Sequence, residues 1–73
     1  MTQTVTFPLA GEYIALNDLL KLAGVCDSGG AGKALVAAGE VAVDGATESR
    51  KTAKIRAGQV VSVAGVRIKV VAA

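Results

Sequence analysis

The segment SGGAGKA, Ser28 to Ala34, places three glycines and a lysine in front of a helix-compatible run, which is the composition of a phosphate-binding loop. A Walker A loop needs a glycine five residues before its Gly-Lys pair and Ser or Thr after that pair, to cradle phosphates and ligate magnesium. Asp27 and Ala34 occupy these two positions here. The dinucleotide fingerprint also fails, because Leu35 replaces its third glycine. The segment therefore argues against a nucleotide cofactor.

The composition leaves little material for catalysis. A chain of 73 residues forms one small domain, and at this size folding hides only about 60% of the surface of the unfolded chain. The chain has no histidine, so the usual general base and the common metal-ligand spacings are both missing. Its single cysteine excludes an internal disulfide. We therefore expect a protein that is not an enzyme and that holds no cofactor and no metal.

Hydropathy and aromatic content restrict the partners. No run reaches the roughly 18 apolar residues of a membrane span, and the N-terminus lacks a charged segment followed by an apolar one. We therefore predict a soluble cytoplasmic protein without a membrane partner. The only aromatic residues are Phe7 and Tyr13, too few for the sheets of stacking rings that bind single-stranded RNA. A nucleic acid would have to be held through its phosphates and its shape.

Charge is segregated along the chain. Eight Lys and Arg against six Asp and Glu give a net charge of only +2. Residues 50–69 nevertheless hold six basic side chains and no acid, while all the acids lie between Glu12 and Glu48. A charge run is most often a solvated face, so by itself this segregation does not establish a binding surface.

Periodicity predicts an arm followed by a helix. Residues 1–12 are rich in Thr and interrupted by Pro8, which indicates an extended N-terminal arm and a candidate edge strand. Residues 13–73 form a single domain. A first helix is expected over residues 17–23, with Asn17 as its N-cap and Gly24 just beyond its end. Its apolar face consists of Leu16, Leu19, Leu20 and Ala23.

A second helix is predicted over residues 29–38, with Ser28 as its N-cap and Gly39 as its stop. Its expected contact face toward the first helix consists of Ala31, Ala34, Leu35 and Ala38. Each glycine in its first turn costs up to about 1 kcal/mol of helix propensity. Close approach of another backbone, or of a phosphate, would make that cost tolerable.

The period changes to two from Glu40 onward, which predicts strands. Asp44-Gly45 is a strong two-residue hairpin signal. A tight turn there would place Glu48 beside Val41 on the buried face, so either the loop is longer and bulged or Glu48 pairs with a basic neighbour. A second hairpin turns at Ala64-Gly65. The order of helix, helix and about four strands predicts a compact α+β domain.

Three spaced patterns, LNxxLK at 16–21, SGGxxKxLxxxGxVxVDG at 28–45 and ExRK at 48–51, resemble the S4 RNA-binding domain over residues 13 to about 71. The most similar members are the small bacterial proteins that consist of this domain and little else, the YbcJ-like group. Many family members carry Ser-Arg at the start of helix two, whereas Gly29 follows Ser28 here. The resemblance implies an alpha-L motif, in which two short packed helices precede a small, mainly antiparallel sheet of about four to five strands.

The resemblance also implies a function connected with the ribosome and translation. Helix two and the loop after the first hairpin would be presented to structured RNA, either ribosomal RNA, transfer RNA or a ribosomal particle. We expect a monomer. The predicted RNA-binding residues are Lys21, Ser28, Gly29, Gly30, Lys33, Arg50, Lys51, Lys54 and Arg56. Arg67 and Lys69, on the last hairpin, are expected only to keep it soluble. The alternative is a protein-interaction or assembly module that pairs through the edge of its sheet.

Overall fold

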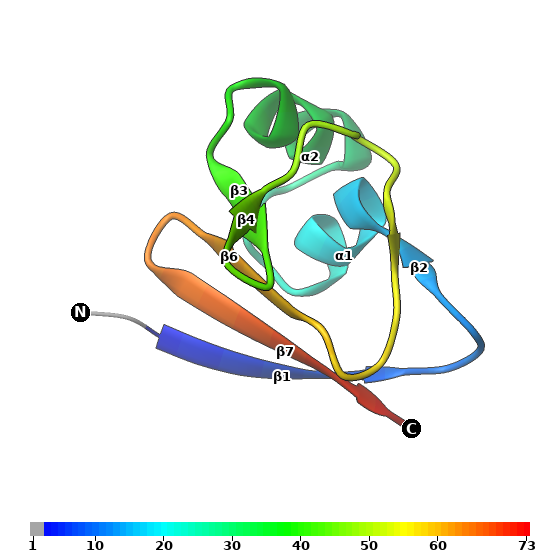
Figure 1. Ribbon diagram of the computed structural model, residues 1–73. Helices are drawn as coiled ribbons and strands as arrows, with labels where there is room; N and C mark the ends of the chain where they lie inside the picture. The colour runs from blue at the N-terminus through cyan, green and yellow to red at the C-terminus, as the bar shows by residue number, and fades with distance from the viewer. Residues whose placement is uncertain (1–2) are drawn as a thin grey trace.

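The computed structural model describes residues 3–73, so the first two residues of the predicted arm lie outside the described part (Figure 1). The helices are α1 (Leu16–Leu22) and α2 (Gly29–Ala37). The strands are β1 (Gln3–Leu9), β2 (Ile14–Ala15), β3 (Val41–Val43), β4 (Ala46–Thr47), β5 (Lys54–Ile55), β6 (Val60–Val63) and β7 (Val66–Ala72).

Five of these strands form one mixed sheet in the order β1-β7-β6-β3-β4. The pairs β7-β6, β6-β3 and β3-β4 are antiparallel, whereas β1 runs parallel to β7 at one edge. β2 and β5 form a separate antiparallel pair. The predicted α+β class, with two helices and a small, mainly antiparallel sheet, is confirmed. The sequence did not indicate the parallel pairing or the separate β2–β5 pair.

The two helices lie on one side of the sheet, as Figure 1 shows, and the core fills the space between them. The buried apolar side chains are Leu9, Leu16, Leu19, Leu20, Val36, Val41, Ala53, Ile55, Val61, Val63, Ile68 and Val70. Residues of β6 and β7 alternate between this core and solvent, as a strand with one buried face must. The helices and the segment around Ile55 are therefore anchored to one core.

Local signals placed the helix ends correctly in three of four cases. Ser28 caps α2, since its Oγ accepts a hydrogen bond from the Ala31 N–H at 3.1 Å. Gly24 and Gly39 follow the two helices with φ of +82° and +76°, a conformation that favours glycine. The prediction for Asn17 was wrong. α1 begins at Leu16 after Ala15, and Asn17 is a buried residue inside the helix, 7% exposed.

The contact face of α2 also differs from the prediction. Gly32 and Val36 are its buried residues, whereas Ala34 and Ala38 are exposed. A Cβ atom at Gly32 would lie 2.7 Å from the backbone oxygen of Asn17, so the glycine allows the two helix backbones to meet more closely than an alanine would. The run of Ala and Gly in α2 offers too little contrast in hydrophobicity to identify its buried face.

The first hairpin has a tight turn, which settles the position of Glu48. Asp44 and Gly45 have φ of +50° and +85°, and the strands pair Val43 with Ala46 directly across them. The Glu48 N–H donates to the Val41 carbonyl at 2.9 Å, so these residues lie side by side. Of the two alternatives, the pairing with a basic neighbour is correct, because Glu48 Oε1 lies 2.8 Å from Arg50 Nε. The second hairpin turns at Ala64-Gly65 as predicted, and it places Val61 opposite Ile68.

Candidate nucleic-acid interface

The first turn of α2 is partly open to solvent. The first N–H groups of a helix have no partner within the helix and carry its positive dipole end. The atom nearest to a Cβ at Gly30 would be Ser28 Oγ at 3.8 Å, which leaves room beside this exposed residue. At Gly29 a Cβ would lie 3.3 Å from Asn17 Nδ2 and 3.6 Å from Asp18 Oδ1. The glycines therefore differ: Gly32 serves helix packing, Gly29 lies against α1, and Gly30 is the open position.

The loop between β4 and β5, residues 48–53, is called the basic loop below. Its backbone is fixed to the start of α1. The Leu16 N–H donates to the Ala53 carbonyl at 2.9 Å, and the Asn17 N–H donates to the Lys51 carbonyl at 3.2 Å. These two carbonyls satisfy N-terminal amides of α1 that a side-chain cap would otherwise serve. Buried Ala53 anchors the same loop. Figure 1 shows the loop, in yellow, descending beside α1 and β2.

Asn17 connects this loop to α2. Its N–H is bonded to Lys51, while its backbone oxygen faces Gly32 and its side-chain amide faces Gly29. The side chain is buried, and Oδ1 has no hydrogen-bond partner among residues 3–73. An unsatisfied buried acceptor costs free energy. The packing around Asn17 must therefore hold its side chain in this position. A single residue thus couples the basic loop to the first turn of the glycine-rich helix.

The predicted basic side chains are all exposed. Lys33 lies on α2 directly after Gly32, and Lys21 lies on α1 one turn after Asn17. Arg50 and Lys51 belong to the loop after β4, and Lys54 begins β5. Arg50 is less available to a phosphate than the others, because its guanidinium is paired with Glu48. The side chain of Arg50 is still 79% exposed, whereas that of Glu48 is 17% exposed, so the guanidinium remains open to solvent and to a second anion.

Tyr13 adds an aromatic ring that the sequence did not single out. Its ring centroid lies 5.0 Å from Lys54 Nζ and 6.0 Å from Arg56 Cζ, and the residue is 46% exposed. The pairing of Ile14 with Ile55 brings these side chains together. Two strands of two residues each have no pattern long enough to predict such a contact. The alternation of Tyr13-Ile14 and Lys54-Ile55-Arg56 was the one available signal.

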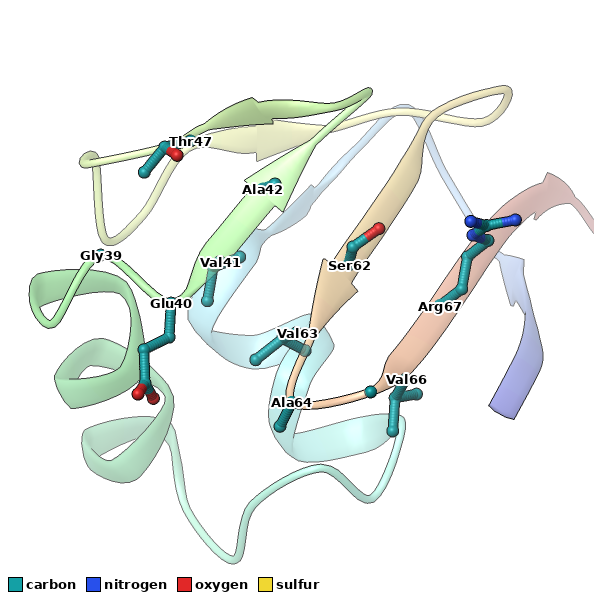
Figure 2. A pocket seen from close by; sticks show the side chains of 11 residues that line it. Gly39, Glu40, Val41, Ala42, Thr47, Ser62, Val63, Ala64, Val66 and Arg67 are labelled. Carbon is teal, nitrogen blue, oxygen red and sulfur yellow. The ribbon is translucent and has the colours of Figure 1, made fainter. Parts of the chain in front are cut away.

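Two of the hollows among residues 3–73 lie on different parts of the molecule. One, of about 460 Å³, is lined by Arg50, Thr52, Ala53 and Lys54, within the basic loop. The other, of about 400 Å³, lies on the sheet between β3, β6 and β7, where Figure 2 shows Ser62 and Arg67 beside one another. This second groove is lined by mostly small side chains with a single cation. Gly39 and Glu40, which follow α2, line one side of it, but none of the predicted RNA-binding residues does.

The described residues also bear on a metal centre and on a membrane span. Among residues 3–73, no three His, Cys, Asp or Glu side chains gather in a way that could hold a metal ion. Within the same range, neither helix is long and apolar enough to cross a membrane.

Comparison with known proteins gives a consistent assignment. The family model of the S4 domain matches residues 7–71. The protein of Escherichia coli (strain K12) named "Putative RNA-binding protein YbcJ" is 53% identical over 68 residues, covering 92% of this chain and 97% of that protein. YbcJ of Shigella flexneri, an uncharacterized protein, shows the same identity and coverage.

A solved structure extends the likeness to three dimensions. The solution structure of YbcJ from E. coli, described as revealing an alphaL motif involved in RNA-binding, matches this one with a TM-score of 0.75. The match has 49% sequence identity and covers 99% of this chain and 92% of that chain. The resemblance inferred from the three sequence patterns is thereby confirmed. The chain belongs to the S4 domain family.

Proposed function

We propose that this chain is a non-catalytic RNA-binding protein that recognises structured RNA through a cationic surface on α2 and the loop after β4. This surface, called the α2–loop surface below, also extends to α1 and β5, and it comprises Lys21, Ser28, Gly29, Gly30, Lys33, Arg50, Lys51, Lys54 and Arg56. Ribosomal RNA, transfer RNA or a ribosomal particle in the cytoplasm is the proposed partner. The motif attributed to the YbcJ structure, one involved in RNA-binding, supports RNA as the class of partner.

The observation that carries the proposal is the position of Asn17. Its contacts with Lys51 and Gly32 hold the basic loop and α2 against the same turn of α1. Exposed cations on a rigid framework suit a double-stranded RNA, which proteins recognise largely by its shape and its phosphates. The helix N-terminus beside Gly30 adds backbone donors, which suit a phosphate. Structured RNA therefore fits this surface better than a flexible strand does.

The sheet edges support the alternative, an assembly module, less well. The exposed edges of the five-stranded sheet are β4, which has only two residues, and β1, which contains Pro8. Short strands and proline are devices that prevent pairing with another chain, because proline has no N–H to donate. Binding driven by phosphates weakens steeply with salt, whereas strand pairing does not, so a salt titration separates the two functions.

We expect the protein to bind a hairpin RNA more tightly than an unstructured strand of the same length. The exposed cations are fixed by the framework, and Phe7 is packed against the core, so a row of stacking rings is not available for successive bases. Fluorescence anisotropy with the two RNAs at one salt concentration measures the difference. Equal affinity, or tighter binding of the unstructured strand, would contradict the proposed preference for structure.

Replacing Lys33 or Lys51 with alanine should weaken RNA binding by about threefold to tenfold each. Each replacement should also reduce the slope of log affinity against log salt, by somewhat less than one for each phosphate that the variant no longer neutralises. Arg50→Ala should have a smaller effect, because Glu48 already partly neutralises that guanidinium. Salt titrations of RNA affinity measure both quantities, and circular dichroism checks that each variant is folded.

Arg67→Ala is the matched control for these variants. Arg67 is an exposed cation on β7, on the solvent side of the sheet away from the helices (Figure 2). The proposal requires its loss to leave the affinity and the salt slope nearly unchanged. If Arg67→Ala weakens binding as much as Lys33→Ala and Lys51→Ala do, the α2–loop surface is not the binding site.

A further inference from the structure

Tyr13 differs from the other aromatic residue of this chain because its ring is exposed to solvent. The other aromatic residue, Phe7, packs against the core, whereas Tyr13 keeps 46% of its surface in water. Lys54 and Arg56 both approach its ring, with the charged atoms 5.0 Å and 6.0 Å from the centroid. An exposed cation–π contact contributes only about 0.5–1 kcal/mol. These two contacts alone therefore do not account for an aromatic ring that remains exposed to solvent.

The backbone holds this group in a fixed place. Ile14 pairs with Ile55, and the side chain of Ile55 is buried in the core. Because successive side chains of a strand point to opposite sides, Tyr13, Lys54 and Arg56 lie together on the outer side of this strand pair. The ring and the two cations are thus arranged before any ligand arrives.

The chemistry of the group matches an unpaired nucleotide. A nucleobase stacks on an aromatic face, and the phosphate attached to the same nucleotide attracts nearby Lys and Arg. We propose that Tyr13, Lys54 and Arg56 form a subsite for one unpaired nucleotide that flanks, or bulges from, the structured RNA on the α2–loop surface. This inference rests on the proposed function, and it adds a position at which the protein distinguishes RNAs of similar shape.

The subsite is limited to a single base. A row of exposed rings binds several bases of a flexible strand, but this chain offers one exposed ring among residues 3–73. The expected preference is therefore for a folded RNA with a single unpaired nucleotide next to its helix. A fully paired RNA uses the cations alone.

Three RNAs test the subsite. The first is a blunt hairpin, the second is the same hairpin with one unpaired nucleotide beside the stem, and the third has an abasic nucleotide at that position. Wild-type protein should bind the second about fivefold more tightly than the third, since the two RNAs carry the same number of phosphates and differ by one base. Tyr13→Phe should keep this ratio, and Tyr13→Leu should bring it close to one.

Fluorescence gives an independent readout. The chain has no tryptophan, so Tyr13→Trp introduces a single probe at the subsite. Its emission should be quenched by the hairpin with the unpaired base and much less by its abasic counterpart. Circular dichroism confirms that each variant folds, as expected for a residue that is half exposed.

The outcomes separate the subsite from the proposed function. If Tyr13→Leu keeps the wild-type ratio, or both RNAs quench Tyr13→Trp equally, the subsite is wrong while salt-dependent binding of the blunt hairpin stands. If the blunt hairpin does not bind but the unpaired base still gives a ratio that depends on Tyr13, the α2–loop surface outside the subsite is wrong, whereas Tyr13, Lys54 and Arg56 still bind the unpaired nucleotide. If none of the three RNAs binds, the subsite and the α2–loop surface are both wrong.

Discussion

Gly30→Glu should weaken RNA binding by about tenfold or more while leaving the protein at least as stable as the wild type. The exposed position beside Gly30 has room for the new side chain, and a carboxylate there would stand where the amides of α2 are proposed to hold a phosphate. Glutamate is a better helix former than glycine, and its charge suits the first turn of a helix. Salt-dependent RNA affinity and thermal unfolding measure the two effects.

Gly30→Gln provides the matched control, because it adds nearly the same volume without the charge. The difference in affinity between the two variants then measures repulsion of a phosphate rather than obstruction. Equal RNA binding by Gly30→Glu and Gly30→Gln would show that no phosphate approaches this turn of α2. Lys33 and the basic loop would then have to carry the binding without the helix amides.

Gly32→Ala should destabilise the fold. The new Cβ would lie 2.7 Å from the backbone oxygen of Asn17 and 3.1 Å from its Cα, and a backbone cannot turn aside as a flexible side chain can. We expect the free energy of unfolding to fall by about 1–3 kcal/mol, as for overpacked cores. In a domain of this size each kcal/mol lowers the melting temperature by roughly 4–8 °C, which thermal circular dichroism measures.

The same substitution two residues earlier is the control. A Cβ at Gly30 would meet Ser28 Oγ at 3.8 Å, an ordinary contact, so Gly30→Ala should be neutral or stabilise the helix by up to about 1 kcal/mol. Identical stability of Gly32→Ala and Gly30→Ala would mean that the backbones of α1 and α2 are not in close contact at Gly32. Asn17 also binds the loop between β4 and β5, through the Lys51 carbonyl. If Gly32→Ala displaces α2 from Asn17, we therefore expect this variant to bind RNA more weakly as well.

Features decided by neighbouring residues could be predicted from the sequence. Ser28 caps α2 through an amide only three residues away, and Asp44-Gly45 turns the first hairpin within its own two residues. Gly24 and Gly39 end the helices by adopting a positive φ. In each case the chemical signal and its structural effect lie within one turn of chain, so no knowledge of the tertiary fold was needed.

Features decided by distant residues could not be predicted. Asn17 has the chemistry of an N-cap, but carbonyls of Lys51 and Ala53 from a remote loop serve the amides at the start of α1. The buried face of α2 depends on how close α1 approaches, which a run of Ala and Gly does not encode. The basic residues of the proposed site were selected by charge and by family pattern, and the structure shows them to be exposed. Tyr13 could not be selected in this way, because its cationic neighbours are set by the pairing of β2 with β5.

The parallel pairing of β1 with β7 joins two strands that leave the ribosome at different times, and this affects the order in which the protein folds. Gln3 pairs with Val66 and Leu9 with Ala72, so β1 binds a strand that is translated 63 residues after it. At about 5–20 residues per second, roughly 3–13 seconds separate the emergence of the two strands. During that interval β1 is an unpaired, threonine-rich strand. Contacts of such long sequence separation form slowly, so we expect this edge of the sheet to be among the last parts of the nascent protein to fold.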